Sequence, residues 1–223
     1  MSEELFEQIA VCVERGKVNA TSPYPPDLKG QDGADELVKK ALDQGLAADD
    51  VLGKGLVVGM TRIGQKFSEN KVFVPDLLMA AKAMTAGMGQ LQPYFESGEA
   101  HHKGVFIIGT VQGDLHDIGK NLVRMVVEGN GWNVVDLGVD VSAEKFLEAA
   151  KENAGAVIGL SALLTTTMVN MEKTVSLVKQ SVPDAKIVVG GAPLTQEFAD
   201  KIGADGYSPD PQGAIGFLEG TVA

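Results

Sequence analysis

Asp114 and His116 are the two side chains of this sequence best placed to do chemistry together. They stand two residues apart in the segment QGDLHDIGKN (112–121), so in an extended turn both project to the same side. A carboxylate this close to an imidazole can accept the Nδ1 proton, fix the tautomer and leave Nε2 free to bind a metal ion. The alternative interpretation is a surface histidine that merely lies beside an aspartate.

Few other ligands accompany this pair. One histidine and one aspartate are too few for zinc, which takes three or four protein ligands. His101 and His102 are neighbours in a small polar segment, which is more typical of a solvated linker. A single protein ligand suits a metal whose other positions a macrocycle already fills, as in haem. A phosphate loop is a further possibility, although neither GxGxxG nor GxxxxGK[ST] occurs.

Residues 99–223 predict a doubly wound α/β domain that would position the pair. The runs GVFIIGTV, NVVDLGV, AVIGLSA and KIVVGGA, and a weaker one at 204–208, alternate with helical segments. This alternation is typical of a five-stranded parallel sheet, flavodoxin-like or Rossmann-like, with helices on both faces. Ligands bind such sheets beyond the carboxyl ends of the strands. We therefore expect the site at the turns 112–121, 161–167 and 190–195.

Residues 1–98 have a helical period instead. Apolar residues recur at three- and four-residue steps in four segments, 4–16, 35–46, 49–67 and 75–93. Pro75 suits a first helical turn, and Pro93 should end the last helix. The segments predict a four-helix bundle, so the fold class is α plus α/β, with a polar hinge at 97–104. The proline-rich stretch 16–34 is either a partner contact or an inert insertion.

Composition excludes several classes of function. The chain has 223 residues, 19 basic and 30 acidic side chains and a net charge of −11. With no basic stripe, we expect no binding to nucleic acid or to an anionic membrane. Cys12 is the only cysteine, so an internal disulfide and a cysteine-rich zinc site are excluded. The acidic start and the lack of a long apolar run predict a cytoplasmic protein.

Three segments of the α/β half together resemble a known family. GDLHDIGKNLV resembles the D-x-H-x-x-G signature of corrinoid-binding (B12-binding) proteins, GLSALLTTT resembles their S-x-L segment, and VVGGAP resembles their G-G segment. Upstream, GMTRIGQKFSENKVFVPDLLMAAKAM resembles the helical cap that precedes this module in cobalamin-dependent methyltransferases such as methionine synthase. The likeness covers the chain from about residue 3 to residue 220.

The resemblance implies that cobalamin binds with its nucleotide tail in a groove of the α/β domain and with His116 as the lower axial ligand of cobalt. Asp114 and Thr167 would join His116 in a proton relay, with Thr167 where methionine synthase has serine. The other cofactor-binding positions that it implies are Gly113, Leu115, Asp117, Ile118, Gly119, Ser161, Leu163, Thr165, Gly190, Gly191, Ala192, Gly206 and Tyr207.

The helical domain would cover the upper face of the corrin with apolar side chains. The candidates are Met60, Leu77, Leu78, Met79 and Met84. A stripe of leucine and methionine at helical spacing is also what the core of a bundle requires. Both interpretations stay open at the level of sequence.

The function implied by the resemblance is that of a methyl carrier, the corrinoid subunit of a multi-component methyltransferase, which is not catalytic alone and cycles between methyl-Co(III) and Co(I). Its partners would be a substrate-specific methyltransferase, a second methyltransferase serving tetrahydrofolate or a thiol, and a reductive activase. Aromatic methyl ethers (O-demethylation), methylamines, betaines and methanol are candidate donors, the ethers favoured on general likeness. A cobalamin storage or sensing module without transfer partners is the alternative. The chain is too short for a mutase barrel, and no helix-turn-helix pattern suggests a DNA-binding light sensor.

Overall fold

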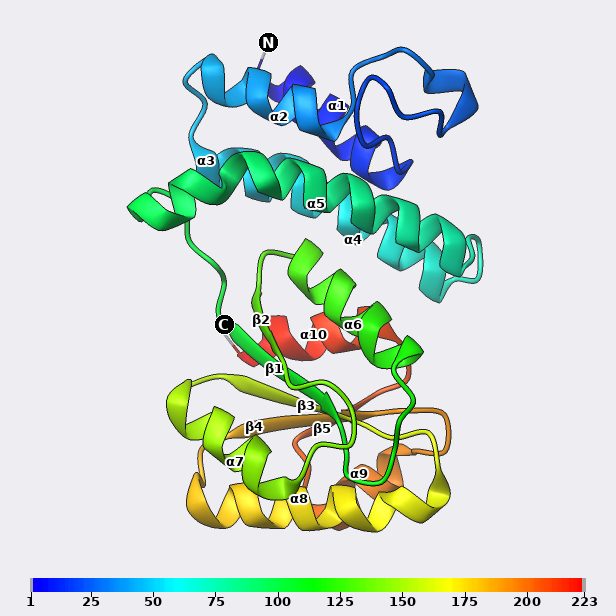
Figure 1. Ribbon diagram of the computed structural model, residues 1–223, viewed down its shortest axis with the longest axis vertical. Coiled ribbons are helices and arrows are strands. Elements are labelled where there is room, and N and C mark those ends of the chain that lie inside the picture. Colours follow the sequence, from blue (N-terminus) through cyan, green and yellow to red (C-terminus); the bar gives the residue numbers. More distant parts are fainter. Residues whose placement is uncertain (1, 222–223) are drawn as a thin grey trace. The chain divides into compact units, whose positions relative to one another are not determined.

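The computed structural model describes residues 2–221, which divide into two compact units (Figure 1). The first unit comprises the residues up to His102 together with Gly129–Gly131. The second comprises Lys103–Glu128 and the residues from Trp132 onward. The boundary therefore lies four residues later than the one expected from composition.

The first unit is helical throughout its regular structure. Its elements are α1 (Ser2–Glu14), η1 (Pro26–Leu28), α2 (Ala34–Asp43), α3 (Ala48–Asp50), η2 (Val51–Leu56), α4 (Val57–Ser68) and α5 (Val74–Ser97). The apolar stripes seen in the sequence face one another, and Ile9, Val38 and Leu56 are fully buried between them. The run predicted as a third helix is continuous from Ala48 to Ser68, but its middle, η2, has the wider turns of a π-helix.

The prediction that Pro93 ends the last helix is wrong. α5 continues through Pro93 to Ser97. A proline inside a helix removes one backbone donor and its ring crowds the carbonyl four residues earlier, which here belongs to Gly89. Leu91, midway between these two residues in the sequence, is fully buried in the bundle, and this packing favours continuation of the helix. The helix ends at Gly98, whose left-handed backbone (φ 79°) is the usual helix stop.

The proline-rich segment 16–34 is held by a buried side chain of its own and by a side chain of α2. The Lys17 ammonium is buried and donates to the carbonyl of Ser22 at 3.0 Å. Glu36 of α2 accepts the N–H groups of Ala20 and Gly33, both at 2.9 Å. The segment thus has a defined course across the helical unit.

The predicted hinge, 97–104, starts inside α5. The backbone N–H of His101 donates to Asp49 at 3.0 Å, and the ring of His102 stacks on Phe95 with centroids 4.2 Å apart. Both histidines therefore contact the helical unit.

The second unit confirms the predicted doubly wound α/β fold. Its strands are β1 (Val105–Thr110), β2 (Asn133–Asp136), β3 (Val157–Ser161), β4 (Lys186–Gly190) and β5 (Gly206–Ser208). They pair in parallel in the order β2-β1-β3-β4-β5, the flavodoxin-like order. The helices are α6 (Ile118–Gly129), α7 (Ala143–Glu152), η3 (Thr165–Thr167), α8 (Met168–Ser181), α9 (Gln196–Ile202) and α10 (Pro211–Thr221).

The strands β1, β3 and β4 are largely buried, which explains why they read as continuous apolar runs, whereas the edge strand β2 is partly exposed. α6 and α10 lie on one face, and α7 and α8 on the other (Figure 1). On the latter face, Ile158, Phe146 and Met171 are fully buried in one core. No helix within residues 2–221 is long and apolar enough to cross a membrane.

Candidate functional site

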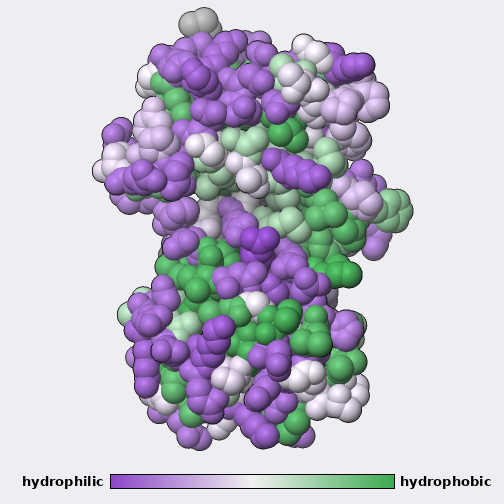
Figure 2. Space-filling model, in the orientation of Figure 1, coloured by the Kyte–Doolittle hydropathy of each residue, from purple (hydrophilic) through white to green (hydrophobic). Residues whose placement is uncertain are grey.

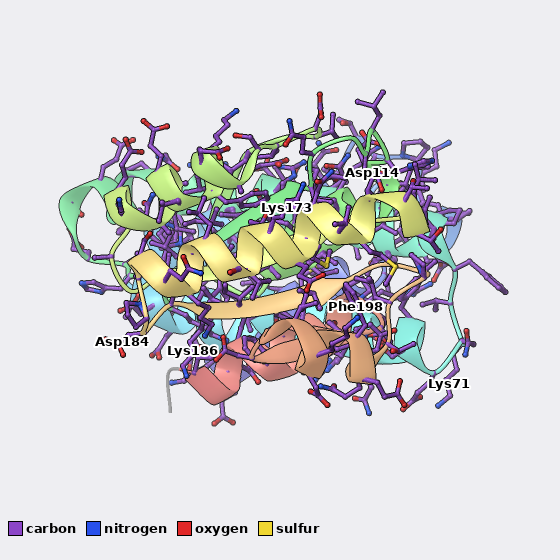
Figure 3. The ribbon with its side chains drawn as sticks, turned by 90° about the horizontal axis from the view of Figure 1, so that it is seen from below. Lys71, Asp114, Lys173, Asp184, Lys186 and Phe198 are labelled. Atoms are coloured by element: carbon purple, nitrogen blue, oxygen red, sulfur yellow. The ribbon has the colours of Figure 1, made fainter. Side chains whose placement is uncertain are left out.

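The site lies where the loops after β1 and β3 meet. These two strands are neighbours in the sheet, and the chain winds away from them in opposite directions, which makes this edge the switch point of the fold. Figure 3 places Asp114 near the start of α8, whereas Asp184 and Lys186, which precede and begin β4, lie at the far end of that helix. Topology alone therefore brings residues 112–121 and 161–167 together.

Asp114 is at the centre of this edge, and its side chain is 0% exposed. Its Oδ2 accepts the N–H groups of Leu163 (2.7 Å) and Leu164 (3.1 Å) and the hydroxyl of Thr167 (3.0 Å). Its Oδ1 accepts the backbone N–H of His116 at 3.1 Å and lies 2.7 Å from the Nδ1 of the same residue. A single carboxylate thus binds both loops.

These donors determine the charge of Asp114. Burial alone would raise the pKa of its carboxyl group, but the N–H of Leu163 and the ring and backbone N–H of His116 outweigh burial and hold that pKa far below its usual range. The group is therefore a carboxylate at neutral pH. Since an ionised carboxylate only accepts hydrogen bonds, the proton between Asp114 and His116 belongs to Nδ1 of the imidazole.

His116 is held but not buried. Its side chain is 51% exposed, and the hydroxyl of Thr110 donates to its backbone carbonyl at 2.9 Å. With Nδ1 occupied by Asp114, the lone pair of Nε2 is available to a ligand. The three residues predicted as a relay, His116, Asp114 and Thr167, are therefore in hydrogen-bonding contact.

Apolar side chains are exposed in the same two loops. Leu115 and Ile118 flank His116 in sequence and are 71% and 73% exposed, and Leu163 and Leu164 follow β3 and are also exposed. Hydrophobic side chains reach the surface of both units, amid mainly hydrophilic areas (Figure 2). Large apolar side chains exposed side by side indicate a binding surface. A free imidazole nitrogen amid such side chains suits a flat macrocycle whose metal needs one protein ligand.

Metal sites built from several side chains are not found in the described part of the chain. Within residues 2–221, no group of three or more histidine, cysteine, aspartate or glutamate residues is arranged to hold a metal ion.

Comparison with known proteins decides between the possible macrocycles. Residues 104–215 match the family model described as B12 binding domain, and residues 31–92 match a second model with the same description. The chain is 38% identical over 216 residues to dimethylamine corrinoid protein 1 of Methanosarcina acetivorans, covering 96% of this chain and 95% of that one. The chain belongs to the family of B12-binding corrinoid proteins. Its cofactor is a corrinoid.

Other members of the family support the same assignment. The trimethylamine corrinoid protein of Methanosarcina barkeri is 41% identical over 186 residues, covering 82% of this chain and 86% of that one. The methanol:cobalamin methyltransferase complex MtaBC of the same organism contains a chain that matches with a TM-score of 0.81 and 27% identity, covering 98% of this chain and 80% of that one. A cobalamin-binding protein of Desulfitobacterium hafniense matches with a TM-score of 0.76 and 26% identity over 100% of this chain and 99% of that one.

The remaining corrinoid-binding positions predicted by resemblance fall at the same edge of the sheet. Gly113 and Asp117 lie in the loop of His116, Gly119 lies in the first turn of α6, and Thr165 is exposed in η3. Ser161 pairs with Gly190 at the ends of β3 and β4, and Ala192 follows them. The role of each of these residues toward the corrinoid stays a prediction.

At three positions, packing within the unit accounts for glycine. A Cβ on Gly191 would lie 1.8 Å from the carbonyl oxygen of Ala162, and one on Gly190 would lie 3.0 Å from that of Ser208. A Cβ on Gly206 would meet the Phe217 ring at 2.6 Å. Tyr207 lies in β5, within the weaker run expected at 204–208, and packs against the core.

The residues predicted to cover the corrin lie in the helical unit. Met60, Leu77 and Met84 are buried, and Met79 is half-buried with its Cβ against Gly16. Leu78 is exposed. The burial of the first three is what a bundle core requires, and contact of any of the five with a corrin stays a prediction.

Sequence analysis missed two residues of the site. Leu164 gives its N–H to Asp114, and Thr110 fixes the carbonyl of His116. The sequence does contain a hint of Leu164, since two consecutive leucines after a strand end are unusual in a solvent-facing turn. Thr110 had none, because a threonine at the end of a β-strand is common.

Proposed function

We propose that the chain is a methyl carrier, which receives a methyl group from a substrate-specific methyltransferase and delivers it to a second methyltransferase. One observation carries this proposal: His116 presents a free Nε2 amid exposed apolar side chains, while the buried Asp114 holds Nδ1 at 2.7 Å. When bound, the cobalt of the corrinoid supplies the position at which the methyl group is held. The proteins of similar sequence named as corrinoid proteins support the assignment.

The residues of the site have separate tasks in this proposal. Asp114 orients the imidazole and fixes its tautomer, so that His116 offers Nε2 rather than a proton. Thr167 hydrogen-bonds to the far oxygen of Asp114 and so extends the contact into a relay, in which a proton taken up by the imidazole is shared. Leu115 and Ile118 are exposed beside His116 in the sequence and would offer apolar contact to the bound corrinoid.

The methyl donor binds to a partner, so its identity comes from relatives rather than from these residues. Relatives are named for dimethylamine and trimethylamine, and a solved complex for methanol. We propose methylamines and methanol as methyl donors for the system to which this chain belongs, and we include aromatic methyl ethers as a further donor in the test. Tetrahydrofolate or a thiol as acceptor, and a reductive activase, complete the proposed system.

The test compares His116→Ala with His101→Ala after loading with cobalamin. Loaded wild-type protein and His101→Ala should show nitrogen hyperfine splitting in the EPR spectrum of Co(II), and His116→Ala should lose it. Unchanged spectra after substitution of His116 would disprove the ligand assignment.

Carrier function is then assayed with labelled methyl donors. Wild-type protein should gain label from one donor of the panel only when the matching methyltransferase is present. Ligation by His116 without transfer from any donor and methyltransferase would instead support the storage or sensing alternative.

A further inference from the structure

Asp140 follows β2 and has an unusual backbone. Its φ is +53°, and Asn70 is the only other non-glycine residue with positive φ within residues 2–221. Asn70 lies in the turn after α4, where a left-handed residue is ordinary. Left-handed backbone costs a non-glycine residue of the order of 1 kcal/mol, although aspartate tolerates it better than most. Such a residue persists where its surroundings hold it, and it often marks a functional site.

Asp140 makes two hydrogen bonds to the segment that presents the candidate ligand. Its Oδ1 accepts the backbone N–H of Gly113 at 2.7 Å. Its own backbone N–H donates to the carbonyl of Asp114 at 3.0 Å. The side chain and main chain of one residue therefore hold both ends of the dipeptide Gly113–Asp114. The backbone of Gly113 is itself in the left-handed region, with φ +85°, so this dipeptide no longer has the geometry of a β-strand.

The loop around Asp140 runs parallel to the end of β1 and is hydrogen-bonded to it. Val111 and Val141 form an isolated parallel bridge beyond the strands, and the N–H of Thr110 donates to Gly138 at 3.0 Å. On the other side, the amide of Asn170 donates to the carbonyl of Gln112 at 2.8 Å. The hydrogen bonds of Asp140 are therefore the contacts that hold the backbone just before it reaches the side chains of Asp114 and His116.

We propose that Asp140 is a positioning residue, which sets the course of the backbone at Gly113–Asp114 and thereby the direction in which the Asp114 carboxylate meets His116. The consequence for corrinoid binding rests on the proposed function, but the consequence for His116 in the corrinoid-free protein does not. Partners that orient metal-ligating histidines typically contribute 10–100-fold to metal affinity.

Three substitutions separate the hydrogen bond from the backbone strain. Asp140→Asn keeps an oxygen acceptor and a residue type that tolerates positive φ. Asp140→Gly removes the acceptor and relieves the strain, so its effect on the site cannot come from failure to fold. Asp140→Ala removes the acceptor and keeps the strain. The control is Asp205→Ala, because Asp205 also accepts a backbone N–H, that of Ile187 at 2.8 Å, but at the opposite edge of the sheet. Asp205 additionally pairs with Lys179 and Lys186, so its removal is the more disruptive change.

The first measurement uses corrinoid-free protein. Long-range ¹H–¹⁵N NMR spectra report which ring nitrogen of His116 carries the proton. Wild-type protein, Asp140→Asn and Asp205→Ala should show the Nδ1–H tautomer, whereas Asp140→Gly and Asp140→Ala should show a mixture. A His116 tautomer unchanged in Asp140→Gly, or equally disturbed in Asp205→Ala, would overturn the proposal.

The second measurement is cobalamin affinity together with the Co(II) EPR spectrum. Asp140→Gly and Asp140→Ala should bind about 10-fold more weakly and show reduced nitrogen splitting, and Asp140→Asn should stay within about 3-fold of wild type, a range far smaller than the effect of losing an orienting partner. Equal affinity in Asp140→Gly and wild type, or equal loss in Asp140→Asn and Asp140→Ala, would contradict the role assigned to the acceptor. If wild-type protein bound no cobalamin, the proposed function would fail, and the tautomer measurement alone would decide the role of Asp140.

Discussion

Each unit of the molecule contains an aspartate whose carboxylate contacts both the backbone N–H and the Nδ1 of a histidine, two residues away in the α/β unit and 52 residues away in the helical unit. Asp114 accepts the backbone N–H of His116 at 3.1 Å and faces its Nδ1 at 2.7 Å, and Asp49 accepts the backbone N–H of His101 at 3.0 Å and faces its Nδ1 at 3.5 Å. The pairs differ in burial. The side chains of Asp49 and His101 are 54% and 73% exposed, whereas that of Asp114 is 0% exposed.

The difference shows what turns such a pair into a candidate site. Water competes with Asp49 for the ring of His101, and an exposed ion-pair contact of this kind contributes little to stability. Asp114 has three further donors, from Leu163, Leu164 and Thr167, which fix the carboxylate before the histidine meets it. The buried acid therefore gives the imidazole of His116 a defined direction, as a candidate ligand requires.

Asp114→Asn should have the largest effect on stability. The amide has only one oxygen, so its NH₂ group must face N–H donors that the carboxylate satisfied. Each unsatisfied buried donor costs about 1–3 kcal/mol, and we expect a loss of about 3 kcal/mol in the free energy of unfolding of the α/β unit, roughly one or two such donors. Trp132, the only tryptophan, is buried in that unit and reports its unfolding in urea. A loss below 1 kcal/mol would contradict the donor count.

Acid should remove the advantage of the buried carboxylate. The pKa of Asp114 is lowered in the folded protein, because hydrogen-bond donors outweigh burial. The contribution of the ionised group is therefore complete above the unfolded-state pKa of about 3.9 and decreases as the pH falls toward the folded-state pKa, by up to about 1.4 kcal/mol per pH unit. The stability difference between wild type and Asp114→Asn should narrow below pH about 4. A difference independent of pH between about 2 and 6, on either side of that unfolded-state value, would show that ionisation of Asp114 is not what stabilises the loops.

Removal of the Thr167 hydroxyl should have an intermediate effect. Thr167 Oγ1 lies 3.0 Å from Asp114 Oδ2 and 2.9 Å from the carbonyl of Leu164, and the charged carboxylate is the stronger acceptor for its single proton. Thr167→Ala should lose about 1 kcal/mol of stability, and Thr167→Ser should retain the bond. Thr174→Ala is the control, because Thr174 is equally buried but donates to a helix carbonyl. The prediction fails if Thr167→Ser is as destabilised as Thr167→Ala.

Sequence predicted the strands, their order along the chain and the residues at their carboxyl ends, because hydrophobic period and turn residues are local signals. It placed Asp114, His116 and Thr167 in one site through family motifs. It could not reveal that the N–H groups of Leu163 and Leu164 bind Asp114, because every residue but proline has such a donor. Nor could it single out Asp140, since a left-handed backbone arises only when the loop after β2 packs beside β1.

Substitution in the exposed pair of Asp49 and His101 should change the free energy of unfolding least, which makes it the reference for the effect of Asp114→Asn. Asp49→Asn keeps an acceptor for the His101 N–H and changes a solvated contact, so we expect a change below about 0.5 kcal/mol. Helix melting followed by circular dichroism measures this for the helical unit, with His101→Ala as the companion variant. Because both substitutions change an aspartate that contacts the backbone N–H and the Nδ1 of a histidine, the larger effect expected for Asp114→Asn reflects its burial and its extra donors. A loss for Asp49→Asn approaching that for Asp114→Asn would mean that the pattern itself, rather than its burial, is what stabilises an aspartate–histidine pair.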